Sequence, residues 1–308
     1  MAFSAQLTNF IGMGDGITEY PDGGWLRNKI AISTPKHEIE IEQHADVITY
    51  DLKELRGSAI HSSTIRITNI GSLEEGEEVA KDLAALLSFA QHSRILPFAF
   101  RFNGRGHGLS GGGFVGAWRP PFHIGDTKSL VRFVELGWQP YQEHKTERSL
   151  FALFALLAHA DFPGTPLEVK LSQVMICIEN LKAYWALSDG KALGITEKSD
   201  GFYNGKKKLS FKGLVEQMLL RVGMPLPGQW QKIVELRNAI IHRGFIRHGD
   251  QVTRKIFGAG LSENDMYHAM LEIEYSVHDL IREYVLRLLK YSGPFYAYSN
   301  PRAPTRIS

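Results

Sequence analysis

The sequence predicts an α+β protein of two domains, a β-rich N-terminal domain with one helix and a C-terminal all-α helical bundle, followed by a short extended tail. Two observations support this division. Up to about residue 125, apolar and polar residues alternate over short spans, which is the pattern of half-buried strands. From there to residue 292, apolar residues recur every three or four positions, as they do on helices. We therefore expect domains at 1–125 and 126–292 and a tail at 293–308.

The strands of the N-terminal domain are expected where the alternation is clearest. These segments are KHEIEIEQ, TIRITNIG, ILPFAFRF and GGFVGAWR, at residues 36–43, 64–71, 95–102 and 112–119. A glycine cluster separates the last two segments, and Pro120, Pro121 and Gly125 end the pattern. The domain boundary is therefore placed near residue 126.

The one helix expected in this domain is LEEGEEVAKDLAALLSFAQ, residues 73–91. Acidic residues occupy its first turns, where the positive end of the helix dipole stabilises them. Val79, Leu83, Leu86 and Leu87 follow at helical spacing and form an apolar face. The segment therefore predicts a helix that packs against the strands.

The C-terminal domain is expected to consist of helices, apart from a short hairpin near residues 243–258. Their apolar residues form wide stripes that allow packing into a bundle. The expected helices are at residues 127–136, 144–160, 167–187, 210–223, 229–244 and 263–292. The tail has three prolines and no apolar periodicity, so we expect it to be extended or frayed.

The composition excludes several classes of protein. The 308 residues are 44% hydrophobic and 22% charged with a net charge of +2, which permits an RNA partner without the strongly basic balance of a nucleic-acid coat protein. No segment approaches the roughly 18 uninterrupted apolar residues of a membrane helix, and no signal peptide is evident, so a cytoplasmic location is expected. The single cysteine, Cys177, lies in an apolar run and predicts a buried, inert thiol.

Motifs for metals, cofactors and a catalytic serine are absent, so we expect no cofactor and no metal. Gly106, Gly108 and Gly111 match the spacing of a dinucleotide-binding loop, but a strand-like segment follows them where that motif requires a helix. A flexible hairpin loop is the favoured interpretation. A nucleotide-binding sensor that uses this loop is kept as a third and weaker hypothesis.

The segment ELRNAIIHRG combines polar residues with helical spacing. Asn238 and His242 lie one turn apart on one face, whereas Arg237 falls near the centre of the apolar arc. A buried arginine requires an acceptor, and Glu179 in the apolar run MICIENL is its natural partner. The same geometry would direct an arginine at a phosphate while His242 exchanges protons. The residues alone leave both interpretations open.

At this segment the sequence resembles the HEPN superfamily, whose signature is Arg, a polar residue, three further positions and His. The order of the helices LSQVMICIENL, SFKGLVEQML and IVELRNAIIHRG is similar to that of an ApeA-type HEPN domain, over about half of the chain. The segment EEVAKDLAALLSFAQHSRILPF is also similar to the N-terminal domains that accompany it, which implies a sensor or regulatory role for residues 1–125.

This resemblance implies a homodimeric, metal-independent endoribonuclease of stress response, toxin-like systems or anti-phage defence by abortive infection. His242 would be the general acid or base, Arg237 would stabilise phosphoryl charge, Asn238 would orient either group, and Glu179 would hold Arg237. RNA would be the substrate and DNA would not be cleaved, because the nucleophile is the 2′-hydroxyl. The alternative is a non-catalytic HEPN module for dimerisation or partner binding, in which Arg237 and Glu179 are structural.

Overall fold

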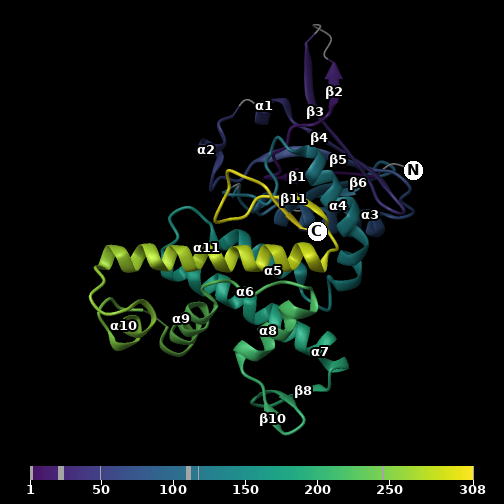
Figure 1. The fold of residues 1–308 in the computed structure, drawn as a ribbon. Helices are drawn as coiled ribbons and strands as arrows, with labels where there is room; N and C mark the ends of the chain where they lie inside the picture. The colour runs from purple at the N-terminus through teal and green to yellow at the C-terminus, as the bar shows by residue number, and fades with distance from the viewer. Residues whose placement is uncertain are drawn as a thin grey trace.

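The computed structural model describes residues 3–19, 24–48, 50–108, 112–116, 118–244 and 246–307. The chain is a mixed α/β structure in which a large antiparallel sheet lies above a set of helices (Figure 1). Helix α11 (Glu263–Leu288) runs across the middle of the molecule and separates the sheet from the smaller helices.

The sheet has seven antiparallel strands in the order β2-β3-β4-β5-β1-β6-β7. Their alternating residues face the core, so that Ile30 is paired with Ile41 and Ile41 with Ile65, all buried. The strands are β1 (Phe3–Thr8), β2 (Gly16–Glu19), β3 (Trp25–Ser33), β4 (Glu38–Gln43), β5 (His61–Ile67), β6 (Pro97–Phe102) and β7 (Arg105–His107).

Helix α3 (Leu73–Gln91) has the predicted bounds and packs on the sheet. Ser72 begins it by accepting a hydrogen bond from the Glu75 N–H, and it ends at His92, whose φ is 52°. Gly76 faces Phe3 of β1 so closely that a Cβ atom there would lie 2.1 Å from the ring. The glycine therefore permits the close approach of this helix to the sheet.

Helix α6 is the centre of the lower helices and contacts α5, α7, α8, α9 and α11, whereas α4 packs on β3 and α3, and α10 packs on α9. Those at 167–187, 210–223, 229–244 and 263–292 were predicted to within a few residues. The helices are α1 (Ala45–Ile48), α2 (Leu52–Leu55), α4 (Thr127–His144), α5 (Leu150–Ala160), α6 (Leu167–Leu187), α7 (Asp189–Ala192), α8 (Phe211–Arg221), α9 (Trp230–Arg243) and α10 (Gln251–Phe257).

The expectation of an all-α C-terminal domain is wrong. Strands β8 (Ile195–Lys198), β9 (Gly201–Asn204) and β10 (Lys207–Lys208) form a three-stranded antiparallel sheet between α7 and α8. Gly205, with φ 61°, makes the tight turn from β9 to β10. The strands are two to four residues long and mostly exposed, so they carry almost no apolar alternation.

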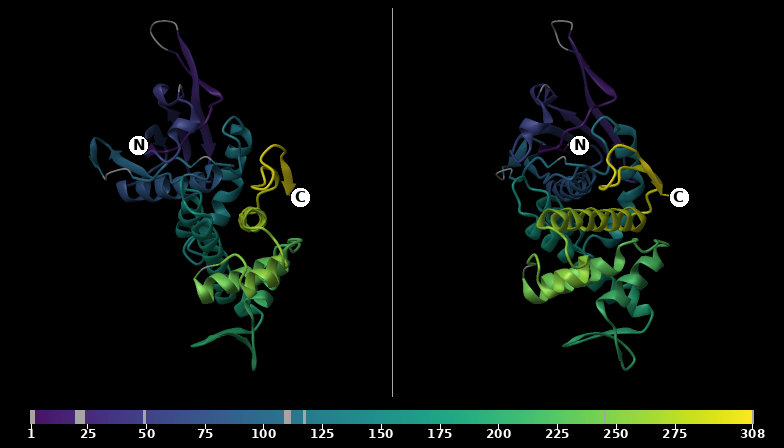
Figure 2. Two further views of the ribbon diagram at one scale, coloured as in Figure 1. Left: turned by 90° about the vertical axis from the view of Figure 1, so that its left-hand side faces the viewer. Right: turned by 60° about the vertical axis from the view of Figure 1, so that its left-hand side comes forward.

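The tail also contains strands and returns to the body of the molecule (Figure 2). Strand β11 (Gly293–Phe295) pairs with β12 (Thr305–Ile307), and the Tyr296 N–H donates to the Pro121 carbonyl oxygen over 2.7 Å. Tyr298 is buried. Contacts with distant parts of the chain, which apolar periodicity does not report, thus hold the tail.

Two further local expectations differ from the structure. The segment 112–119 was expected to be a strand, but its described residues contribute only an isolated parallel bridge between Val115 and Arg56. Residues 243–258, where a hairpin was expected, contain α10, which begins after Asp250 because that carboxylate accepts from the Thr253 N–H.

One cluster of buried apolar side chains runs from Phe3 through α3 and α11 to Ile307. The core is thus continuous across residue 126, and the domain division there stays a prediction. Among the described residues, no helix is both long and apolar enough to span a bilayer.

Candidate functional site

Helix α9 carries the Arg237, Asn238 and His242 motif in its last two turns. It ends at Gly244, whose φ of 76° is typical of a helix C-terminus. The helix is held against the body of the molecule by its buried residues, which are Trp230, Ile233, Val234, Leu236, Ala239 and Ile240. This face fixes the directions of the three polar side chains.

Arg237 points away from the end of the helix and toward α6. Its Nε donates to Glu179 Oε1 over 2.5 Å, and its guanidinium lies 4.6 Å from the centre of the Phe211 ring. The other carboxylate oxygen of Glu179 accepts from Lys182 Nζ over 2.6 Å. The Arg237 side chain is 13% exposed, so the predicted pairing with Glu179 is present in a mostly buried setting.

Asn238 and His242 are exposed and line one hollow between α9 and α10. The hollow has a volume of about 340 Å³, and its other lining residues are Glu235, Ala239, Arg243, Val252, Lys255 and Ile256. Asn238 Oδ1 accepts from Arg237 Nη1 over 2.9 Å. The motif is therefore divided, because Arg237 does not line the hollow but contacts it through Asn238.

The arrangement has the elements of acid/base chemistry on a polyanion. His242 presents an imidazole to solvent, and no hydrogen bond or ion pair to it is found among the described residues. Arg243 and Lys255 on the rim supply positive charge, which attracts phosphates. Lys255 Nζ lies 3.6 Å from Glu235 Oε1, so part of this charge is neutralised.

The glycine loop forms part of the β6–β7 hairpin. Asn103 and Gly104 make the turn with φ values of 51° and 76°, and His107 Nε2 lies 3.1 Å from Glu77 Oε1. Gly111 lies outside the described residues. The described residues that follow, 112–116, contain no helix whose N-terminus would bind a phosphate.

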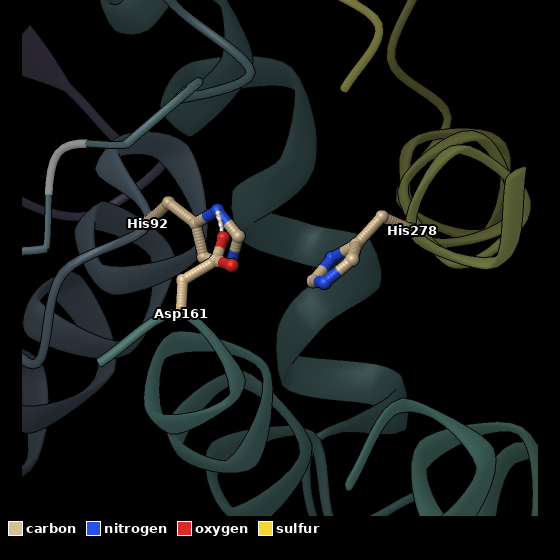
Figure 3. A group of neighbouring side chains, drawn as sticks. All are labelled: His92, Asp161 and His278. Atoms are coloured by element: carbon tan, nitrogen blue, oxygen red, sulfur yellow. Dashed lines mark ion pairs between the residues drawn. The ribbon is translucent and has the colours of Figure 1, made fainter. Parts of the chain in front are cut away.

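A second cluster of polar side chains is buried where three helices meet. His92 follows the end of α3, Asp161 follows the end of α5, and His278 lies in α11 (Figure 3). One possible metal-binding atom from each residue lies within 4.8 Å of the other two, and His92 Nδ1 is 3.3 Å from Asp161 Oδ2. All three residues are almost completely buried.

Neighbouring groups fix the orientation of this cluster. The Tyr298 hydroxyl donates to Asp161 Oδ1 over 2.6 Å, and its ring stacks on His278 with 4.1 Å between centroids. His278 Nε2 lies 2.9 Å from Glu274 Oε1. Arg282 is buried and its Nη2 donates to His92 Nδ1 over 2.8 Å. Side chains from the tail and from one long helix thus complete the cluster.

The charge states follow from burial and from these contacts. Burial lowers the pKa of His92 to about 3, so its imidazole is neutral near pH 7. Burial would raise the pKa of Asp161, but the hydrogen bond from the Tyr298 hydroxyl and the Lys170 ammonium, 3.5 Å from Oδ1, lower it, so the carboxyl is ionised. Burial lowers the pKa of Arg282 to about 10, which leaves the guanidinium charged.

No local signal in the sequence indicates this second cluster. His92, Asp161 and His278 are far apart in the chain and match no metal-binding spacing. The cluster depends on the packing of α3, α5 and α11 around the tail, which only the tertiary structure provides.

No protein-family model matches the chain, and neither a curated protein nor a solved structure is significantly similar to it. The resemblance to HEPN proteins therefore rests on the motif and on the order of the helices.

Proposed function

We propose that this chain is a metal-independent endoribonuclease of the HEPN type. The observation that supports the proposal most directly is the hollow between α9 and α10, which places Asn238 and His242 side by side next to the cations of Arg243 and Lys255. An exposed imidazole beside a phosphate-attracting rim is what general acid/base cleavage of RNA requires.

In the proposed reaction, His242 accepts the proton of an RNA 2′-hydroxyl, whose oxygen then attacks the adjacent phosphorus. The bond to the 5′-oxygen breaks, and that oxygen receives a proton, which leaves a 2′,3′-cyclic phosphate and a 5′-hydroxyl. DNA is not a substrate because it lacks the nucleophile. A homodimer would supply the second histidine as the acid, as the resemblance implies.

Arg237 and Asn238 have supporting roles in this proposal. Glu179 and Phe211 hold the Arg237 guanidinium, and its Nη1 donates to Asn238 Oδ1. Asn238, which lines the hollow, is thereby held in place by the arginine. Arg237 would stabilise the charge that develops on the phosphoryl oxygens.

The test is cleavage of total RNA in EDTA by the wild type and by His242→Ala, with analysis of the fragment ends. His268→Ala is the matched control, because His268 is also exposed and does not line the hollow. Cyclic-phosphate ends from the wild type and the control, but not from His242→Ala, would support the proposal. Equal cleavage by His242→Ala would remove it. To allow for a ribonuclease that needs a cellular activator, growth arrest is also compared in cells that express the wild type, His242→Ala or His268→Ala.

The second candidate is a non-catalytic HEPN module for dimerisation or partner binding. It is favoured by the pairing of Arg237 with Glu179, which directs the arginine into the protein and away from the hollow. RNA that stays intact with all variants, in vitro and in cells, together with a stable dimer, would favour this alternative. The proposed place in anti-phage defence or a toxin-like response applies to the ribonuclease alone.

A further inference from the structure

The His92, Asp161 and His278 cluster contains buried polar atoms without hydrogen bonds. Among the described residues, Asp161 Oδ2 and His278 Nδ1 form none, and His278 Nε2 contacts the Glu274 carboxylate without a well-directed hydrogen bond. A buried polar atom that loses its hydration without gaining a partner is unfavourable, and native proteins usually satisfy such atoms with water or an ion. These atoms therefore point to a ligand.

The outer atoms of the same side chains already contact other groups. His92 Nε2 lies 3.0 Å from the Leu157 carbonyl oxygen, and His278 Nε2 lies 2.9 Å from Glu274 Oε1. Asp161 Oδ1 accepts from the Tyr298 hydroxyl. Metal-bound histidines have this arrangement, in which the second ring nitrogen faces a carbonyl or carboxylate oxygen. His278 Nδ1 and Asp161 Oδ2 are left for a ligand, whereas His92 Nδ1 accepts from Arg282 Nη2 and becomes available when that contact is released.

The spacing of these atoms suits a single ion. Two ligand atoms at about 2.0–2.1 Å from tetrahedral zinc are about 3.3 Å apart, and His92 Nδ1 is 3.3 Å from Asp161 Oδ2. Figure 3 shows the His278 ring facing these two side chains from α11, and all three ligand atoms lie within 4.8 Å of one another.

We propose that His92 Nδ1, Asp161 Oδ2 and His278 Nδ1 bind a Zn²⁺ ion that joins α3, α5 and α11. Two imidazoles and one carboxylate are a donor set that zinc prefers. All three side chains are almost completely buried, so we expect the role of the ion to be structural. The ion would enter as these three helices assemble, because metal binding to such a site is coupled to folding.

Arg282 has to release one contact when the ion binds. Its Nη2 donates both to His92 Nδ1 and to the Arg119 carbonyl oxygen, and its Nη1 donates to the Tyr296 carbonyl oxygen over 3.2 Å. The guanidinium keeps the two carbonyl contacts when His92 turns to the metal. In this structure Arg282 lies next to His92 Nδ1, and Lys170 Nζ lies 3.5 Å from Asp161 Oδ1.

The test measures zinc in the untagged full-length protein by mass spectrometry, followed by Co²⁺ substitution and thermal unfolding with Zn²⁺ or a chelator. We expect about one zinc ion per chain, visible Co²⁺ absorption with nitrogen and oxygen ligands, and a melting temperature about 5 °C higher at a hundredfold excess of Zn²⁺ over its dissociation constant. Asp161→Asn and His278→Asn should lose the ion, whereas His268→Ala, an exposed histidine on α11, should keep it.

The proposal is overturned if the wild type holds no zinc as purified or after incubation with Zn²⁺ and its melting temperature does not respond. Water would then be the partner of the cluster. It is also overturned if folded Asp161→Asn and His278→Asn bind zinc as tightly as the wild type, because the ion would lie elsewhere. The measurements on the wild type decide the question even if neither variant folds.

Discussion

Arg237 of α9 and Glu179 of α6 form an ion pair in which Arg237 Nε donates to Glu179 Oε1 over 2.5 Å. Lys182 Nζ donates to the other carboxylate oxygen of Glu179 over 2.6 Å. Glu179 thus neutralises two cations. Removal of Glu179 leaves Arg237 and Lys182 close together without an anion, whereas removal of Arg237 leaves a carboxylate that is still paired.

The first prediction follows from this asymmetry. Glu179→Gln should lower the free energy of unfolding by about 2–3 kcal/mol, and Arg237→Gln by about 1 kcal/mol. Urea unfolding of both variants measures the difference. Equal losses, or a larger loss for Arg237→Gln, would show that Lys182 does not share the carboxylate.

The second prediction concerns the rim of the hollow. Arg243→Ala and Lys255→Ala should each raise the KM for RNA about fivefold with little change in kcat, because each removes one attraction to the phosphate backbone. Lys207→Ala in β10 is the control, since that exposed lysine lies outside the hollow. Steady-state cleavage at two salt concentrations tests this prediction. An equal rise of KM in Lys207→Ala would show that RNA binding depends on the overall charge of the protein and not on the rim of the hollow.

The third prediction concerns two glycines inside helices. Gly76→Ala should destabilise the protein by about 1–2 kcal/mol, because the clash of its Cβ with Phe3 outweighs the gain in helix propensity of about 1 kcal/mol. Gly137→Ala in α4 should stabilise it by about 0.5–1 kcal/mol, because the nearest atom to its Cβ would be 3.6 Å away. Denaturant unfolding decides both signs. A stable Gly76→Ala would mean that α3 moves off the sheet without cost.

The fourth prediction concerns Cys177, which is buried as predicted. Burial raises the pKa of its thiol, so the reactive thiolate is not formed in the folded protein. Ellman's reagent should not react with the native protein and should react with one thiol per chain in guanidinium chloride. Rapid reaction of the native protein at neutral pH would mean that α6 opens readily.

The fifth prediction is a pH dependence from the sheet. The Arg66 guanidinium donates to Glu42 over 2.6 Å and holds the pKa of that carboxyl below its ordinary value of 4.5. The folded state therefore binds this proton less readily than the unfolded chain. The resulting stability is present above pH 4.5 and is lost as the pH falls through the lower folded pKa.

Glu42→Gln should therefore reduce the loss of stability on acidification, as measured by thermal unfolding between neutral and acidic pH. Glu54→Gln is the control, because Glu54 is exposed and forms no ion pair among the described residues. If Glu42→Gln loses stability on acidification as steeply as the wild type, the Arg66 contact does not stabilise the folded state.

Helices with a strong apolar stripe were predictable from the sequence. The bounds of α3 and α6 agree with the prediction because their apolar residues recur at helical spacing over 19 and 21 residues. The exposed strands β8–β10 have no such stripe, and the described residues of the segment 112–119 alternate but form only one isolated bridge, between Val115 and Arg56. Pairing partners, which periodicity does not report, decide these cases.

The motif on α9 was also visible in the sequence, including the pairing of Arg237 with Glu179, because an arginine in an apolar arc requires a buried acceptor. The sequence did not show that Asn238 and His242 line a hollow from which Arg237 is excluded. The packing of α10 against α9 creates the hollow at Asn238 and His242, and α10 itself was not predicted.

The order of residues thus specified the long helices, their apolar faces and the buried state of Cys177, since these depend on side chains a few positions apart. The tertiary structure alone decided the seven-stranded order of the sheet, the return of the tail and the meeting of His92, Asp161 and His278. These features join residues that are far apart in the chain. Their contacts form only when the core excludes water, and no local pattern encodes that event.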